Sequence, residues 1–133
     1  FSCMPPEIIN NDEVSSPAYG AYCNRLVSLL KTKGKAIMAL NPANLANGPV
    51  NSGMLASKMG IIVSRIIAET GLNELLIEGG ATASAVLTQL NINRLCPVQQ
   101  LSPGVIRMRV VDNDQLYVTL KPGSYEWPAQ VWN

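Results

Sequence analysis

A short apolar run that leads directly into two glycines constrains the fold of this chain more than any other feature. Residues 75–78 (LLIE) have the composition of a buried strand, and Gly79 and Gly80 follow without a gap. Beyond them, apolar residues recur at the i, i+3, i+4 and i+7 spacing of a helix: Ala83, Val86, Leu87 and Leu90. A strand that turns sharply into a helix predicts an α/β protein with helices packed on a sheet.

The preceding residues alternate between the same two patterns. A helix is predicted to begin at Pro17, after Ser16 as N-cap, and to end at Gly34. Residues 35–40 (KAIMAL) predict a short buried strand, and residues 53–70 predict a second long helix with one apolar face. Residues 1–16 are predicted to be a strand remnant followed by a loop, and the Asn- and Pro-rich residues 41–52 are predicted to be a loop.

The C-terminal part of the chain changes to period-2 alternation. Residues 97–101 predict a strand, and Pro103-Gly104 has the chemistry of a type II turn. Residues 105–111 and 115–121 flank a short polar segment and predict a hairpin. The complete pattern predicts a three-layer α/β fold, with a mostly parallel sheet flanked by helices and an antiparallel C-terminal hairpin.

Length and composition predict one domain over residues 1–133. The hydrophobic fraction of 47% is sufficient for a core, and only 14% of the residues are charged. The net charge of +1 without a basic run argues against a nucleic-acid partner, and the longest apolar stretch is too short to span a membrane. Because the chain begins with Phe1 and has no signal-peptide pattern, we expect a cytoplasmic piece of a longer protein.

Two absences exclude common catalytic chemistries. The chain has no histidine, so it contains no histidine general base, no Ser-His-Asp triad and no histidine zinc ligand. Its three cysteines, Cys3, Cys23 and Cys96, form no CxxC pair. We expect all three to be reduced thiols buried as small apolar side chains.

The glycine turn is the best candidate binding feature. The first N–H groups of a helix lack intrahelical partners and lie at the positive end of the helix dipole, so Gly79-Gly80-Ala81-Thr82 could hold a phosphate group. The turn matches neither the P-loop nor the dinucleotide-binding pattern. Taken alone, the two glycines are more readily explained by a tight strand-to-helix turn.

Two further turns contain residues that could line a ligand-binding site. Residues 121–124 (KPGS) end a strand with a cation, a rigid turn and a glycine, and Lys121 could offset phosphate charge. Residues 102–105 (SPGV) place Gly104 in a similar turn. For each turn, an ordinary structural role remains the alternative.

These segments together resemble one family. Residues 77–86 (IEGGATASAV), 102–105 and 120–124 (LKPGS) are similar, in order, to motifs of the C-terminal nucleotide-binding domain of the four-carbon acid sugar kinases. That family was formerly a domain of unknown function and was also labelled as a Hrp-dependent type III effector. The resemblance covers most of this chain but only the last third of a family member.

The resemblance implies a two-domain kinase that uses ATP and magnesium to phosphorylate a sugar acid such as threonate or erythronate. An N-terminal domain, absent from this chain, would hold the sugar acid. The ATP contacts implied for this chain come from its three glycine turns: Gly79, Gly80, Ala81, Thr82 and Gly123, with Lys121 and Gly104 as extensions. No catalytic residue and no protein metal ligand is implied within the chain.

The chain also departs from the family pattern. Ala81 replaces the glutamate of the family's Gly-Gly-Glu-Thr turn, and Glu126 replaces the last glycine of its Lys-Ser-Gly-Asn-Phe-Gly motif. Without the sugar-acid domain, we expect this chain to bind nucleotide and to catalyse little by itself. Two alternatives stay open, a non-catalytic nucleotide-binding module and a protein-interaction module. The oligomeric state is also open, with a homodimer as one option.

Overall fold

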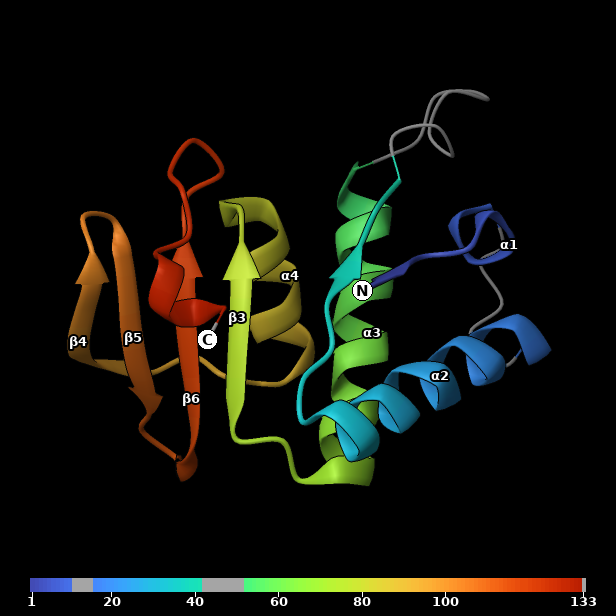
Figure 1. Ribbon diagram of the computed structural model, residues 1–133, viewed down its shortest axis with the longest axis horizontal. Coiled ribbons are helices and arrows are strands. Elements are labelled where there is room, and N and C mark those ends of the chain that lie inside the picture. Colours follow the sequence, from blue (N-terminus) through green and yellow to red (C-terminus); the bar gives the residue numbers. More distant parts are fainter. Residues whose placement is uncertain (11–15, 42–51, 133) are drawn as a thin grey trace.

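The fold is α/β, as the sequence predicts. The computed structural model in Figure 1 describes residues 1–10, 16–41 and 52–132. Residues 42–51 of the predicted loop at 41–52, and residues 11–15 of the predicted N-terminal loop, lie outside the described residues. The helices are α1 (Pro6–Ile9), α2 (Pro17–Lys33), α3 (Ser52–Thr70), α4 (Gly80–Gln89) and the short 3-10 helix η2 (Ala129–Val131). The strands are β1 (Ser2–Cys3), β2 (Met38–Ala39), β3 (Glu74–Glu78), β4 (Leu95–Ser102), β5 (Val105–Val110) and β6 (Asn113–Lys121).

Helix α2 begins and ends at the residues that the sequence predicts. Pro17 occupies its first position after the N-cap Ser16, although no side-chain hydrogen bond from Ser16 caps the helix. At the other end Gly34 adopts a left-handed conformation with φ 76°, and its N–H donates to the carbonyl oxygen of Leu30 at 2.9 Å. The helix is therefore ended by a residue that tolerates positive φ.

The strands form two sheets with both kinds of pairing. β1 pairs with β2 in parallel, and the second sheet has the order β3-β6-β5-β4. Within it β3 and β6 are parallel, whereas β6, β5 and β4 form an antiparallel meander. The predicted hairpin is confirmed, and Gly104 has the φ of 79° that a type II turn requires at its third residue. The second sheet is mostly antiparallel and not mostly parallel as predicted, because β4 joins the hairpin and only the β3–β6 pair is parallel.

Two clusters of buried side chains lie on either side of α3. One cluster combines α1, α2 and α3, with Tyr22 and Leu26 packed near Ile62. The other combines α3, α4 and the second sheet, and Val118 of β6 is completely buried in it. In Figure 1, α4 covers one face of β3, and the C-terminal segment crosses the opposite face of β6. No helix in the described ranges is long and apolar enough to cross a bilayer.

The three cysteines differ in exposure, which corrects one expectation. Cys23 is buried in α2, as predicted, but Cys3 is only half-buried and Cys96 is exposed on β4. The prediction was wrong for Cys96 because residues 96–100 of β4 are all exposed, and a period-2 pattern does not show which strand lies at an uncovered edge. All three are free thiols.

Candidate nucleotide-binding edge

Gly79 forms the sharp turn between β3 and α4. It is the N-cap of α4, with φ 93° and ψ 138°, a conformation that residues with a Cβ rarely adopt. Its N–H donates to the carbonyl oxygen of Lys121 at 2.9 Å, and its own carbonyl oxygen accepts from the N–H of Ala83 at 3.0 Å. The first glycine of the pair is therefore required by the backbone, independently of any ligand.

Gly80 and Ala81 leave the start of α4 open to solvent. Both residues are exposed, and a Cβ added at Gly80 would meet no atom within 4 Å. The N–H groups of the first helical turn point away from the helix and carry its partial positive charge. Thr82, half-buried in the same turn, is placed to add a hydroxyl group. A phosphate group can therefore approach the backbone closely here.

Lys121 lies beside this turn with its ammonium group directed at the protein itself. Its side chain is only 1% exposed. The ammonium donates to the carbonyl oxygen of Pro122 at 2.9 Å and to that of Tyr125, and it lies 3.3 Å from Oε1 of Glu78. The predicted phosphate-facing lysine is thus near the candidate site, but three protein oxygens already surround its charge.

Glu78 connects the end of β3 to the C-terminal segment. It pairs in register with Lys121, and its Oε2 accepts a hydrogen bond from Nε1 of Trp127 at 3.0 Å. The Lys121 ammonium also lies 5.4 Å from the centre of the Trp127 ring. No local pattern in the sequence links residues 78 and 127, so this contact is visible only in the fold.

The remaining predicted residues lie at the same edge of the sheet. Figure 1 shows the β4–β5 turn, the loop after β6 and the start of α4 at one end of the molecule. Gly104 is in contact with the Tyr125 ring, whose nearest atoms would be 3.2 Å from a Cβ at that position. A Cβ at Gly123 would meet nothing within 4 Å. The structure therefore brings all three predicted glycine turns together.

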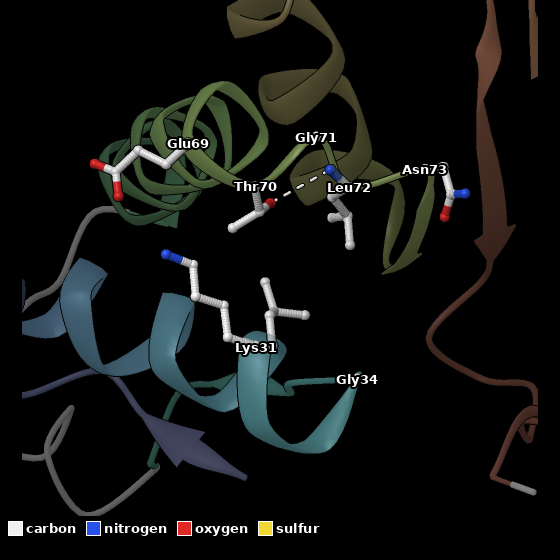
Figure 2. Close-up of a pocket in the computed structure, with 8 residues that line it drawn as sticks. Lys31, Gly34, Glu69, Thr70, Gly71, Leu72 and Asn73 are labelled. Carbon is white, nitrogen blue, oxygen red and sulfur yellow. Dashed lines mark hydrogen bonds between the residues drawn. The ribbon is translucent and has the colours of Figure 1, made fainter.

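A separate hollow lies at the opposite end of β3. It has a volume of about 350 Å³ and lies between the ends of α2 and α3, with Lys31 and Glu69 on either side in Figure 2. Thr70, which accepts the N–H of Leu72 at 3.3 Å, forms part of its wall. It contains none of the predicted site residues, because residues 70–73 precede β3 and the glycine turn follows it.

The shifted pKa values belong to groups outside the candidate edge. Burial raises the pKa of the Tyr22 phenol, which donates to the carbonyl oxygen of Ser2 at 3.0 Å, and burial also raises the pKa of the Cys23 thiol. A hydrogen bond to Glu74, at the start of β3, raises the pKa of Arg107. Among the described residues, no group of three or more His, Cys, Asp or Glu side chains could hold a metal ion.

The fold is similar to those of longer proteins. A citrate-bound, domain-swapped dimeric protein of Bordetella bronchiseptica, with a domain of unknown function (DUF1537), matches at a TM-score of 0.70 and 20% identity, over 98% of this chain and 30% of that one. A Haemophilus influenzae protein assigned to the same family matches at a TM-score of 0.68 and 18% identity, over 93% of this chain and 31% of that one. A Salmonella typhimurium LT2 protein named provisionally as a tRNA synthase matches at 0.69 and 19%, over 94% and 31%.

A family model covers most of this chain. No curated protein matches it significantly. The chain spans about 30% of the length of the first of these solved structures. The model described as the nucleotide-binding C-terminal domain matches residues 16–125, which include α2 and all three glycine turns. The chain therefore belongs to the family of nucleotide-binding C-terminal domains.

Proposed function

We propose that this domain binds MgATP at the edge formed by the glycine turns. The observation that carries the proposal is the open first turn of α4, where the Gly80 position has 4 Å of free space and the helix dipole favours a phosphate group. The adjoining turns supply Gly104 and Gly123, and the buried Lys121 lies next to Gly79. The family match adds support, because its model includes these residues.

Magnesium would arrive with the nucleotide phosphates. Mg²⁺ in such sites is held by one or two carboxylates together with phosphate oxygens. Ala81 supplies no carboxylate, and the nearby Glu78 is engaged by Lys121 and Trp127, although its side chain is 51% exposed. The residues present therefore fit a nucleotide-borne ion better than a dedicated protein metal site.

In the whole protein, we propose, this domain supplies ATP for phosphorylation of a four-carbon sugar acid such as threonate or erythronate. The support is the order of the motifs and the DUF1537 relatives, which are about three times as long as this chain. The sugar acid would bind the part of the protein that this chain lacks. A homodimer is a compatible assembly, since the Bordetella bronchiseptica relative is a domain-swapped dimer.

Thermal unfolding with and without millimolar MgATP tests the nucleotide site. A ligand at a hundredfold excess over its dissociation constant stabilises the folded state by about 2.7 kcal/mol. The shift should disappear in Gly80→Val, which fills the open space, and persist in Ser84→Val, at an exposed position one turn further along α4. MgGTP and inorganic phosphate separate base recognition from anion binding. Equal shifts in both variants would contradict the proposed location.

The kinase proposal needs the protein that carries both domains. We expect this protein to release ADP only when threonate or erythronate is present. We also expect Gly80→Val to abolish the release. Nucleotide binding without ADP release for any four-carbon acid would instead support a non-catalytic module.

A further inference from the structure

We propose that Lys121 is a positioning residue that joins the two turns of the nucleotide site, and that it does not contact phosphate. This inference rests on the proposed function and assigns a role within that same site. The backbone of Lys121 fixes the first turn. Its carbonyl oxygen accepts the N–H of Gly79 at 2.9 Å, so the end of β6 holds the first glycine of the α4 turn in place.

The side chain of Lys121 fixes the second turn. Its ammonium donates to the carbonyl oxygens of Pro122 and Tyr125, which bracket Gly123. Two carbonyl oxygens directed at one buried cation hold residues 122–125 in a single arrangement. One residue therefore bonds to both turns, through its backbone on one side and its ammonium group on the other.

Glu78 completes the arrangement and explains how a buried lysine is tolerated. A buried charge without a partner is costly, whereas here the carboxylate lies 3.3 Å from the ammonium. The same carboxylate accepts the indole N–H of Trp127, so it also holds the C-terminal segment in place. With three oxygen atoms around it, and only 1% of the side chain exposed, the ammonium has little capacity left for a phosphate group.

Glu78→Gln distinguishes positioning from direct phosphate contact by the sign of its effect. If Lys121 positions the turns, loss of the carboxylate charge loosens the ammonium, and MgATP binds about tenfold more weakly by isothermal titration calorimetry. If Lys121 contacts phosphate, the same substitution frees the ammonium and removes a negative charge, so that MgATP binds more tightly. Tighter or unchanged binding in Glu78→Gln would overturn the inference.

Lys121→Met, and the double variant that combines it with Glu78→Gln, test whether the two residues act as one unit. We expect Lys121→Met to weaken MgATP binding about tenfold and the double variant to bind no more weakly than the weaker single one, because both substitutions break one unit. Lys121→Arg, which keeps the charge, should restore part of the affinity and serves if Lys121→Met does not fold. Additive losses would contradict the shared role.

Lys35→Met is the matched control. Lys35 also donates to a backbone carbonyl oxygen of the C-terminal segment, that of Trp132 at 3.1 Å, but it lies outside the glycine turns. Its substitution should leave MgATP affinity unchanged, and an equal loss would mean that any contact with this segment has the same effect.

Amide hydrogen exchange separates failure of this inference from failure of the proposed function. Lys121→Met should accelerate exchange of the Gly79 and Tyr125 N–H groups, which donate to the carbonyl oxygens of Lys121 and Pro122, in the absence of ligand, whereas Lys35→Met should not. Normal exchange in Lys121→Met overturns the positioning role. If exchange is accelerated in Lys121→Met but the wild-type chain binds no MgATP, the nucleotide proposal fails and the joint between the turns remains.

Discussion

At the scale of single residues, the two adjacent glycines of the α4 turn have different reasons to be glycine. Gly79 has φ 93°, which only glycine adopts without strain. Gly80 lies in the helix with open space around its Cβ position. The first is therefore a structural requirement, and the second is free to serve a ligand.

Alanine substitution should separate these two reasons. Gly79→Ala should lower the free energy of unfolding by about 1–3 kcal/mol, because a Cβ at this φ is strained. Gly80→Ala should change it by less than about 1 kcal/mol or raise it, because alanine is the better helix former. Urea denaturation monitored by circular dichroism measures both. Equal losses would mean that Gly80 also has a backbone role.

The cysteines should differ in their reactivity in the folded protein. Cys96 is exposed, whereas Cys23 is buried and has a raised pKa, so less of it is the reactive thiolate at neutral pH. We expect iodoacetamide to alkylate Cys96 first, Cys3 more slowly and Cys23 only on unfolding, as followed by peptide mass spectrometry. Early alkylation of Cys23 would contradict the packing of α2 against α3.

The hydrogen-bond partners of two buried lysines could not be predicted from the sequence. The Lys58 side chain on α3 is buried, and its ammonium donates to the carbonyl oxygens of Ile8 and Ile9 at 3.2 and 2.8 Å. Lys121 was predicted to face a phosphate group and instead faces protein oxygens. Backbone oxygens take part in both cases, and their positions depend on the fold and leave no pattern of side chains in the sequence.

At the scale of elements, the helices and strands were more predictable than their contacts. Periodicity located α2 and α3 within a residue or two of their observed bounds, and α4 follows the two glycines as predicted. The strand predicted over 35–40 shortens to Met38–Ala39, because only these residues pair with β1. The pairing of β3 with β6 was not predictable, since the two strands are separated by α4 and the first half of the meander.

Helices α3 and α4 approach closely at Gly60. A Cβ at this position would lie 3.1 Å from the carbonyl oxygen of Ala85 and 3.3 Å from the Cα of Val86. These are backbone atoms of α4, so the clash cannot be relieved by a change of rotamer. Gly60 therefore sets the distance between the two helices that carry the second cluster of buried side chains.

Gly60→Ala should destabilise the protein by about 1–3 kcal/mol through overpacking. Gly20→Ala is the matched control in α2, where a Cβ meets nothing within 4 Å, and it should stabilise by up to about 1 kcal/mol. Thermal unfolding of the two variants gives the comparison. A neutral Gly60→Ala would show that α3 and α4 can separate without cost.

At the scale of the whole molecule, protection is unequal across the second sheet. β6 lies between β3 and β5, and Val118 at its centre is completely buried. β4 pairs only with β5 among the described strands, and residues 96–100 are exposed. The sheet is thus well covered at β6 and poorly covered at β4.

Amide hydrogen exchange should follow this gradient. We expect the slowest exchange in β6 and the fastest strand exchange in β4, because edge strands with few buried contacts open locally at low cost. Mass spectrometry of peptides from the two strands measures the difference. Comparable protection in β4 would indicate that another surface, such as a second copy of the chain, covers it in solution.

The hydrogen bond from Trp127 to Glu78 places an intrinsic fluorophore at the candidate site. The chain has two tryptophans, and the other, Trp132, is 52% exposed. With Trp132→Phe, fluorescence would come from one indole, hydrogen-bonded to a carboxylate and 5.4 Å from an ammonium group at the candidate site. Because indole emission responds to nearby charge, nucleotide arriving at this edge should change its wavelength or intensity without any attached label.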